Sequence, residues 1–428
     1  KMNTKKKKLL IIELNEFCPE YIKQLAQHYK LQNLIKVLNF THTITLSNDK
    51  KEFYGLDPWV QWVNIHTGLR SEEHGVKILG ENLKKNHTQI WNHLHHQYQL
   101  RWAVIGPLNA KKGSSLGCVS FLPDPWSSNE KAYPNELNEL LEVIRYVSKN
   151  YLALNYFALS SKIIKALGFF LRRNNLFILK ELFWELFKVI YKPGINIHTL
   201  TTLLDYVCVL YYLKIKSKNN IDISIVFLNH IAHLQHHFWE KYPIIHPQME
   251  HGIKICDKII NLLLKDLNLN ETNLLVLNGF KQKRNDENDI QIYRQVSTKL
   301  MLNKLGITKV MIEQNMTNDV LLEFSSLQET NNAYKILLNC YLDTGHKLFD
   351  VSKINSQKIF IQLNIHHVVN KNVFIKYRHI KIPFYDLFIN LGRTGSHINE
   401  GDIFSPNIEF PNKIFNHEIF ENLVKIYG

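Results

Sequence analysis

Cysteine is scarce in this chain, and no long uninterrupted run of apolar residues is present. The five cysteines among 428 residues are scattered, odd in number and never form a CxxC pair. Three of them, Cys208, Cys256 and Cys340, lie in apolar segments, which favours reduced, buried thiols over a disulfide framework. No apolar run has the ~20 residues that a transmembrane helix needs. The sequence therefore predicts a cytoplasmic protein.

The first residues do not change that prediction. The stretch KMNTKKKKLLIIEL is basic and then apolar, as a signal peptide is, but its apolar run covers only Leu9–Leu14 and contains Glu13. No small-residue cleavage site follows. We expect a buried first β-strand there instead.

Acidic residues are outnumbered. Lys and Arg total 52 against 38 Asp and Glu, which gives a formal net charge of +14. This excess favours an anionic partner, such as a phosphate compound or an acidic lipid surface, although a generally basic surface gives the same totals. No DNA- or RNA-binding signature accompanies the charge, so a nucleic acid is not expected as a partner. Hydrophobic residues make up 45% of the chain, which is ample for a large core.

Buried-strand patterns that alternate with helical periodicity indicate an α/β fold. The strands expected from this pattern are Leu9–Leu14, Thr41–Leu46, Leu100–Leu108, Ile221–Leu228 and Asn273–Leu277. Such an order predicts a mainly parallel central sheet between two layers of helices. We also expect a helix from Pro19 to about Leu38, a Trp-rich loop over 57–68, helical periodicity over 82–96, a polar loop over 282–289, and a final helix over Ile414–Tyr427.

A segment rich in aromatic residues interrupts the strand pattern. Residues 135–218 have helical periodicity, so we expect a helical insertion or cap there and an α/β core formed by 1–134 and 219–428. The simplest role of the insertion is packing between helices. Basic residues flank its Phe and Trp residues, however, so a lid, a homodimer face or a peripheral membrane contact through 160–192 also fits.

A cluster of histidines follows the strand Ile221–Leu228 directly. The cluster comprises His230, His233, His236 and His237, preceded by Asn229. Open α/β sheets bind ligands outside the carboxyl ends of their strands, and helical spacings of three and four place side chains on one face, as a metal site needs. At most two or three of these histidines can share one ion. His236 and His237 can equally pack beside Phe238 and Trp239.

Two further stretches contain residues suited to chemistry. In HTGLRSEEHG, Thr67 is expected at a strand-to-helix junction, where the helix N-terminus would favour a phosphoryl group. The alternative is that Thr67 merely caps a helix. In TGSHINEG, His397 lies between glycines in a loop that must bend sharply, although a surface turn has the same composition.

Taken in order, these motifs resemble the alkaline phosphatase superfamily, in particular its phosphodiesterase, nucleotide-pyrophosphatase and phosphoglycerol or phosphoethanolamine transferase branches. Where members have a metal-binding Asp after the first strand, this chain has Asn15. The nucleophile pattern TG-x-x-P-x-x-HG is matched from Thr67 to Gly75, with Ser71 in place of Pro. The pattern D-x-x-x-H is matched by Asn229 and His233, and G-x-H-x-x-x-G by Gly395, His397 and Gly401. The strand that should end in SDHG reads Leu277-Asn278-Gly279-Phe280.

The resemblance implies a phosphate-ester hydrolase or phosphoryl-group transferase with an alkaline phosphatase-like fold. Thr67 would be the nucleophile, and His230 an acid–base residue or a third ligand. The implied metal ligands are His233, His397, Asn229 and Asn15. Glu13 is a further candidate ligand, which the strand period places on the same face as Asn15. Glu16 is the alternative acid.

The departures of this chain from the family motifs predict how many metal ions it binds. Amides are weak ligands for zinc and the second Asp-His pair is missing, so one ion is expected rather than two. Zinc is expected, with Mn or Mg as alternatives. Arg70 or Lys281 can also replace a metal by stabilising a phosphoryl oxygen.

Loss of catalysis is the other interpretation. A degenerate member of the fold would serve as a binding or scaffold protein that recognises a phosphorylated glycan or lipid. In either case the expected partner is an anionic, phosphate-containing small molecule, glycan or lipid.

Overall fold

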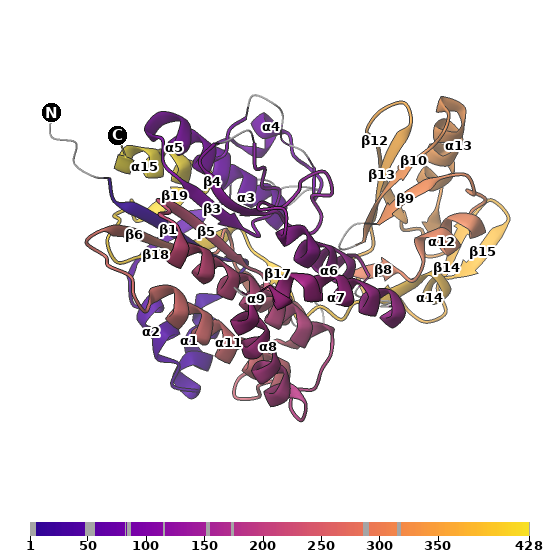
Figure 1. The fold of residues 1–428 in the computed structure, drawn as a ribbon. Coiled ribbons are helices and arrows are strands. Elements are labelled where there is room, and N and C mark those ends of the chain that lie inside the picture. Colours follow the sequence, from indigo (N-terminus) through magenta and orange to yellow (C-terminus); the bar gives the residue numbers. More distant parts are fainter. Residues whose placement is uncertain are drawn as a thin grey trace. The chain divides into compact units, whose positions relative to one another are not determined.

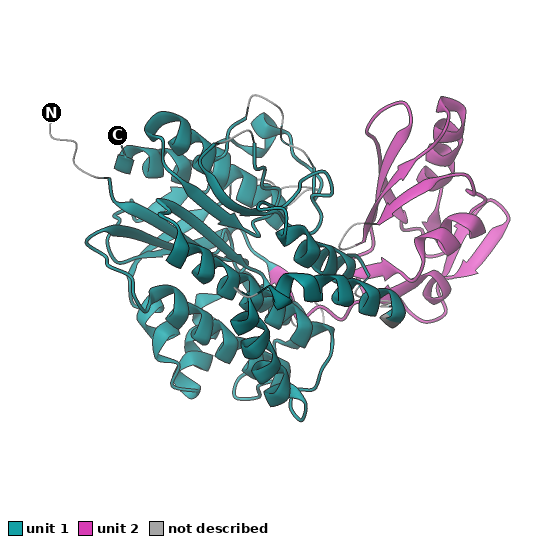
Figure 2. Cartoon of the chain, in the orientation of Figure 1, with its two compact units in different colours: residues 1–284, 397–428 teal, residues 285–396 magenta. Residues whose placement is uncertain are grey.

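The structure is a computed structural model that describes most of the chain. The described residues are 6–47, 56–81, 83, 87–113, 116–150, 155–172, 175–285, 291–314 and 318–427. They form two compact units, residues 1–284 with 397–428 (unit 1) and residues 285–396 (unit 2), which Figure 2 shows in different colours. Parts of the expected helical stretch 82–96 and of the polar loop 282–289 lie outside the described residues.

Unit 1 is built on an eight-stranded, mainly parallel sheet, which confirms the predicted fold class (Figure 1). The strand order is β19-β2-β18-β6-β1-β5-β3-β4. Strand β18 runs antiparallel to both of its neighbours, whereas β6, β1, β5, β3 and β4 are parallel. The strands are β1 (Lys8–Leu14), β2 (Thr41–Leu46), β3 (Trp102–Ile105), β4 (Cys118–Leu122), β5 (Ile223–Leu228), β6 (Thr272–Leu277), β18 (Glu400–Ser405) and β19 (Lys413–Phe415).

Helices cover both faces of this sheet (Figure 1). On one face, β1 contributes Leu10, Ile12 and Leu14 to a core cluster shared with α1, α2, α6, α9, α10 and α11. On the other face, Trp62 of α3 packs edge-on against Phe227 of β5. The helices of unit 1 are α1 (Pro19–His28), α2 (Gln32–Leu38), α3 (Pro58–Thr67), α4 (Ser71–His74), α5 (Ile90–Tyr98), α6 (Leu137–Lys149), α7 (Tyr156–Leu171), α8 (Leu176–Val189), α9 (Ile197–Lys218), α10 (His230–Phe238), α11 (Pro247–Leu264) and α15 (Glu418–Tyr427).

Three local predictions were wrong. The helix expected from Pro19 to Leu38 is two helices, because Lys30 adopts a positive φ of 56° between them. The final helix begins at Glu418, since Lys413–Phe415 joins the sheet as β19. The Trp-rich loop is helix α3, which has Pro58 in its first turn and ends at Gly68 in the left-handed conformation. Proline at the start and glycine just past the end are helix boundary signals, and the density of Trp residues hid them.

The expected helical character of residues 135–218 is confirmed by α6 to α9. Phe169, Ile178 and Tyr206 from three of these helices belong to the same core cluster as β1 and β5. The status of this segment as an insertion or cap stays a prediction. None of the helices in the described part of the chain is both long and apolar enough to cross a membrane.

Unit 2 has a hydrophobic core of its own, which includes Tyr293, Leu322, Phe349, Ile361 and Phe384. Its largest sheet has four antiparallel strands in the order β12-β13-β10-β9. The sequence analysis did not separate this unit from the rest of 219–428. Its elements are β8 (Tyr293–Gln295), α12 (Thr298–Lys304), β9 (Met311–Gln314), β10 (Asp319–Glu323), α13 (Leu327–Leu338), β11 (Tyr341–Leu342), β12 (Phe349–Lys353), β13 (Lys358–Leu363), β14 (Phe374–Tyr377), β15 (Ile380–Pro383), α14 (Phe384–Leu387) and β16 (Phe388–Asn390).

Two short strands lie where the chain passes from one unit to the other. They are β7 (Gln282–Arg284) and β17 (Gly395–His397). All five cysteines are free; Cys18, Cys256 and Cys340 are buried, and Cys118 and Cys208 are half-buried. Burial is therefore confirmed for Cys256 and Cys340, whereas Cys208, the third cysteine in an apolar segment, is half-buried.

Candidate metal centre

Polar residues follow three neighbouring parallel strands of the central sheet. Asn15 and Glu16 come directly after β1, Asn229 after β5 and Asn278 after β6. The backbone N–H of Asn15 donates to the carbonyl of Leu228 at 3.0 Å, and that of Glu16 to the carbonyl of Asn278 at 3.1 Å. The side chains after these strands are therefore held together at the carboxyl edge of the sheet, where α/β proteins bind ligands.

A carboxylate and two imidazoles converge at this edge. Oε2 of Glu16 lies 2.9 Å from Nε2 of His236 on α10 and 2.9 Å from Nε2 of His397, the last residue of β17. The two Nε2 atoms are 3.3 Å apart. Within the described ranges, these three residues are the group of His, Cys, Asp or Glu side chains whose ligand atoms all lie within 4.8 Å of one another. We call Glu16, His236 and His397 the triad.

The spacing of the triad suits a tetrahedral metal ion. With metal–nitrogen bonds of about 2.0–2.1 Å, two ligand atoms of a tetrahedral zinc ion lie about 3.3 Å apart. The triad atoms are separated by 3.3 Å and 2.9 Å, close to that value. Three protein ligands also leave a fourth position open, as in catalytic zinc sites. The residues present therefore fit one divalent ion.

Glu16 is fixed in place and kept ionised. Its backbone has a φ of 53°, a left-handed conformation that non-glycine residues rarely adopt and that is often found at functional sites. Gln282 Nε2 donates to Oε2 at 2.6 Å, and Asn15 Nδ2 donates to Oε1 at 3.1 Å. Burial alone would raise the pKa of Glu16, but attraction and hydrogen bonds from His397 and His236 hold it well below its usual value.

Two amides lie beside the triad where the family resemblance implies two acids. Asn15 Nδ2 donates to Asn229 Oδ1 at 2.7 Å, and Trp62 Nε1 donates to Asn15 Oδ1 at 2.7 Å. Each Asn thus uses its amide in a neutral hydrogen bond. The pair adds no negative charge to balance a second divalent ion.

Glu13, the acid expected to help bind the metal, has a different partner. Its Oε1 lies 2.7 Å from Nε2 of His66 on α3, and both residues are fully buried. Glu13 and Glu16 are three residues apart on either side of the strand end. Glu16, the alternative acid from the sequence analysis, lies beside His397. It therefore occupies the position that was expected for Glu13.

Thr67 is not at a helix N-terminus. It is the last residue of α3, and Gly68 follows it as the C-cap. Its Oγ1 donates to the carbonyl of Val63 at 2.7 Å and accepts from the N–H of Leu69 at 3.3 Å. The expected help from a helix dipole was therefore wrong for α3, because the carboxyl end of a helix carries the negative pole.

The other two predicted histidines of α10 have partners on α9. His230 is fully buried, and its Nδ1 lies 2.8 Å from Oδ2 of Asp205. His233 Nε2 lies 2.8 Å from Nδ1 of His198, with the two rings 4.8 Å apart between centroids. Of the predicted metal ligands, His397 is the one that belongs to the triad.

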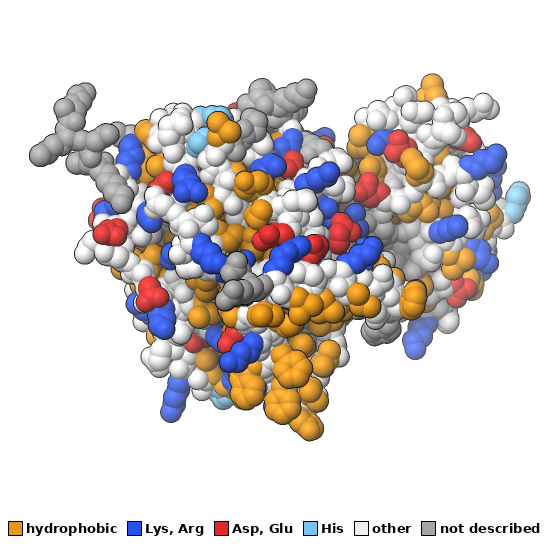
Figure 3. All heavy atoms as spheres, viewed as in Figure 1, with side chains coloured by type: hydrophobic (Ala, Val, Ile, Leu, Met, Phe, Trp, Pro, Cys, Tyr) orange, Lys and Arg blue, Asp and Glu red, His pale blue; other side chains and the backbone are white. Residues whose placement is uncertain are grey.

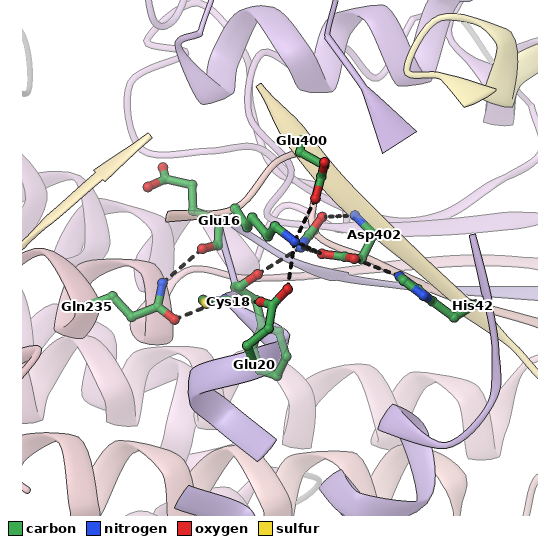
Figure 4. A network of polar contacts seen from close by, with 10 residues as sticks. Glu16, Cys18, Glu20, His42, Gln235, Glu400 and Asp402 are labelled. Carbon is green, nitrogen blue, oxygen red and sulfur yellow. Dashed lines mark hydrogen bonds and ion pairs between the residues drawn. The ribbon is translucent and has the colours of Figure 1, made fainter. Parts of the chain in front are cut away.

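Lys281 is surrounded by carboxylates. Its Nζ lies 2.8 Å from Glu20, 3.0 Å from Glu400 and 3.8 Å from Asp402. Figure 4 labels these three carboxylates. These carboxylates raise the pKa of Lys281, although burial opposes them. Lys281 thus neutralises protein carboxylates, whereas the replacement of a metal requires a cation that is available to a phosphoryl oxygen.

Gln235 connects α10 to the turn after β1 (Figure 4). Its Nε2 donates to the carbonyl of Glu16 at 2.9 Å, and its Oε1 accepts from the N–H of Cys18 at 3.1 Å. Gln235 is fully buried. Because His236 is the next residue, this pair of bonds fixes the position of α10 relative to Glu16.

Sequence reasoning missed His236 as a ligand. It was expected either to bind a metal or to pack beside Trp239, and no role was assigned to it. A signal was available: His236 is seven residues after Asn229, two helical turns, so both side chains lie on one face. Asn229 contacts Asn15, and His236 contacts Glu16 next to it.

No family model and no curated protein matches the chain. Solved structures do match it. Murine ectonucleotide pyrophosphatase/phosphodiesterase 5 matches over 98% of this chain and 95% of that chain, with 11% identity and a TM-score of 0.47. The human protein matches over 98% and 94%, with 11% identity and a TM-score of 0.45. Phosphonoacetate hydrolase from Sinorhizobium meliloti 1021, in complex with phosphonoacetate, matches over 98% and 95%, with 11% identity and a TM-score of 0.44.

The matches describe a likeness of fold and assign no residue or activity to this chain.

Proposed function

We propose that this chain is a phosphate-ester hydrolase or phosphoryl-group transferase that uses one divalent ion held by Glu16, His236 and His397. The observation that carries the proposal is the convergence of a buried carboxylate and two imidazoles at the carboxyl edge of the sheet. Zinc suits this set of nitrogen and oxygen ligands, and Mn or Mg are the alternatives. The substrate is an anionic phosphate-bearing small molecule, glycan or lipid.

The ion, when bound, supplies Lewis-acid stabilisation of the charge on a phosphoryl oxygen. Thr67 is the proposed nucleophile. Its Oγ1 forms a bond to phosphorus while the bond from phosphorus to the leaving ester oxygen breaks, and the hydroxyl proton ends on that leaving oxygen. Water or an acceptor hydroxyl then takes the phosphoryl group and restores the Thr67 hydroxyl. The hydrogen bond from Thr67 to the Val63 carbonyl must open for this step.

His230 is proposed as the acid–base residue. Asp205 holds its Nδ1 at 2.8 Å, while its buried Nε2 has no hydrogen-bond partner in the described part of the chain. Such an arrangement fixes the ring and leaves the buried Nε2 without a competing hydrogen bond from the described residues. The predicted ligand role of His233 is replaced in this proposal by that of His236, because His236 is the residue beside Glu16.

A second candidate is favoured by one observation. The neutral Asn15–Asn229 pair lies beside the triad, where a two-metal enzyme would need acids. A catalytically degenerate protein that binds a phosphorylated glycan or lipid through the same edge fits that pair.

The test uses the full chain stripped of metal and reloaded with zinc or manganese. We expect hydrolysis of bis(p-nitrophenyl) phosphate or p-nitrophenyl phosphate that requires the metal. Thr67→Ala should abolish turnover and keep the bound metal, whereas His236→Ala and His397→Ala should lose both. His379→Ala, at an exposed position of unit 2, is the matched control. Equal hydrolysis by Thr67→Ala rejects the nucleophile, and a bound metal without turnover supports the binding protein.

A further inference from the structure

Exposed hydrophobic side chains gather over α7 and α8. Figure 3 shows them in the lower part of the face in view. The patch comprises Phe157, Ile163, Ile164, Leu167 and Leu171 of α7, Leu176, Phe177, Phe183, Trp184 and Phe187 of α8, and Ile190 and Tyr191 after it. Contiguous apolar surface of this kind marks a binding surface in a folded protein.

Helix α8 buries Ile178 and Val189 and carries a second apolar stripe on its outer face. Phe183, Trp184 and Phe187 are 70%, 56% and 55% exposed, whereas Glu185 is 3% exposed. The carboxylate of Glu185 faces inward and lies 2.7 Å from Nζ of Lys258 on α11. An ordinary surface helix turns its charges to water and its apolar stripe to the core. The outward apolar stripe therefore has no packing role within unit 1.

Helix α7 is apolar on two faces. Leu159, Ala166 and Phe169 are buried in the core cluster. Phe157, Ile164 and Leu171, at intervals of seven residues, form a second stripe that is exposed. A helix that is hydrophobic on both sides requires an apolar environment on both sides. The core provides one, and the second lies outside unit 1.

Basic residues surround the patch. The stretch 156–192 contains seven Lys and Arg and two Glu, a balance of +5. Lys162, Arg172 and Lys192 pair with carboxylates outside the stretch, Glu142, Glu139 and Glu250, which reduces the balance to +2. Next to α8 is a pocket whose lining includes Lys188, Lys192, Lys254 and Lys258. The four lysines share two acidic lining residues, Glu185 with Lys188 and Lys258, and Glu250 with Lys192 and Lys254, so the lining keeps a charge of +2 after pairing. Glu181, outside the lining, also lies 3.1 Å from Lys258. Burial lowers the pKa of His251, also in the lining, to about 4, so it adds no charge at neutral pH.

We infer that the α7–α8 patch binds the surface of a membrane containing acidic phospholipids. Aromatic and aliphatic side chains would enter the boundary between headgroups and acyl chains, as amphipathic interfacial helices do. The lysine pocket beside them would accept the phosphate of an anionic headgroup. Trp184, stacked on Phe187 and with Lys188 Nζ 5.7 Å from its ring centroid, is the kind of residue that gathers at membrane–water boundaries.

A second copy of the chain is the other occupant to consider. A symmetric dimer places the same patch on both partners, so two stretches with the same positive balance would face each other. Like charges opposed across an interface are unfavourable. An acidic lipid surface has the complementary charge and is therefore the favoured occupant.

The test measures co-sedimentation of the full chain with vesicles. Vesicles of phosphatidylcholine alone are compared with vesicles in which about a third of the lipid is phosphatidylglycerol, and we expect at least about tenfold stronger partitioning to the second, weakened by salt. The double variant Phe183→Ser with Trp184→Ser should abolish partitioning. Lys192→Ala with Lys254→Ala should weaken it on anionic vesicles.

Matched controls come from unit 2. Met311 and Val368 are exposed to a similar extent, and Lys371 and Lys376 are exposed lysines, so their Ser and Ala variants should bind as the wild type does. Thermal unfolding confirms that each variant is folded. Equal binding to both vesicle types overturns the inference. So does a wild-type dimer that ignores vesicles and dissociates in the Phe183→Ser, Trp184→Ser variant. Neither outcome depends on turnover, so the proposed function is tested separately.

Discussion

At the scale of single residues, two amide side chains determine how many divalent ions the site can bind. Asn15 and Asn229 form a neutral hydrogen bond of 2.7 Å directly beside the charged triad. Trp62 satisfies the remaining oxygen of Asn15. A divalent ion requires negative ligands nearby, and this pair provides none. The residues at this edge therefore fit one ion, with an uncharged position beside it.

Restoring both acids should restore a second ion. We expect the double variant Asn15→Asp, Asn229→Asp to bind two zinc ions where the wild type binds one, measured by elemental analysis after dialysis. Without metal, two carboxylates in contact repel each other and raise one pKa. The metal-free variant should therefore unfold at a lower temperature than the wild type and recover when zinc is added. Asn372→Asp, at an exposed position, is the control. An unchanged stoichiometry of one would contradict this interpretation of the pair.

The choice between Glu13 and Glu16 shows where sequence reasoning stops. A period of two placed Glu13 on the same strand face as Asn15, which holds as long as the strand is regular. The strand ends at Leu14, and Glu16 follows in a left-handed conformation that the strand period does not describe. That turn directs the Glu16 carboxylate to His236 and His397. The sequence predicted that the site lies at the carboxyl edge of the sheet. Which acid points into that site depends on the φ angle of Glu16, which the sequence pattern does not reveal.

At the scale of elements, α8 is held by its buried charges. Glu185 lies 2.7 Å from Lys258 on α11 and 2.9 Å from Lys188, and Lys258 also lies 3.1 Å from Glu181. Burial alone would raise the pKa of Glu185, but hydrogen bonds from Lys258 and Lys188 lower it overall. A carboxylate whose pKa falls on folding stabilises the folded state above its unfolded pKa of about 4.3.

The ion pair that holds α8 to α11 should weaken in acid. As the pH falls through the folded pKa of Glu185, its contribution to the free energy of unfolding is lost. We expect Glu185→Gln to cost about 1–3 kcal/mol at pH 7, since it removes the buried carboxylate that pairs with Lys258 and Lys188. The cost should shrink toward zero below about pH 4. Urea unfolding across a pH series measures the difference, with the exposed Glu72→Gln as control. A cost that is constant with pH would rule out the ion pair as its cause.

Elements buried on both sides were the easiest to predict. Strands β1, β5 and β6 lie in the middle of the sheet and are nearly continuous apolar runs. Strand β4, CVSFL at one edge of the sheet, was missed, because its partly exposed first residues dilute that signal. Helix α3 was mistaken for a loop for the opposite reason: all ten of its residues are buried, so it has no amphipathic stripe.

At the scale of the whole molecule, the chain consists of two compact units, and the triad lies entirely in unit 1. No change of composition marks the start of unit 2, so the sequence analysis extended the α/β core to the end of the chain. What separates unit 2 is long-range pairing. Its strand β10 pairs with β9 and with β13, and the pairs are antiparallel, in contrast to the parallel centre of unit 1. Pairing partners are not visible in one sequence.

Unit 2 should fold without the rest of the chain. Its core residues, among them Leu322, Phe349 and Ile361, contact one another within 285–396 and form a cluster distinct from that of unit 1. A contiguous segment with its own core meets the physical condition for independent folding. We expect a fragment of residues 285–396 to unfold in one cooperative transition, with a urea slope of about 1–2 kcal/mol per molar for its size.

The matched control is a single buried charge. Phe349 is fully buried in the unit 2 core, so Phe349→Asp in the fragment should abolish the cooperative transition and leave an unfolded circular dichroism spectrum. The same substitution in the full chain should unfold residues 285–396 and leave metal binding at the triad intact, because every triad ligand belongs to unit 1. A fragment without a transition, or a full-length variant that loses the metal, would show that the two units depend on each other for stability.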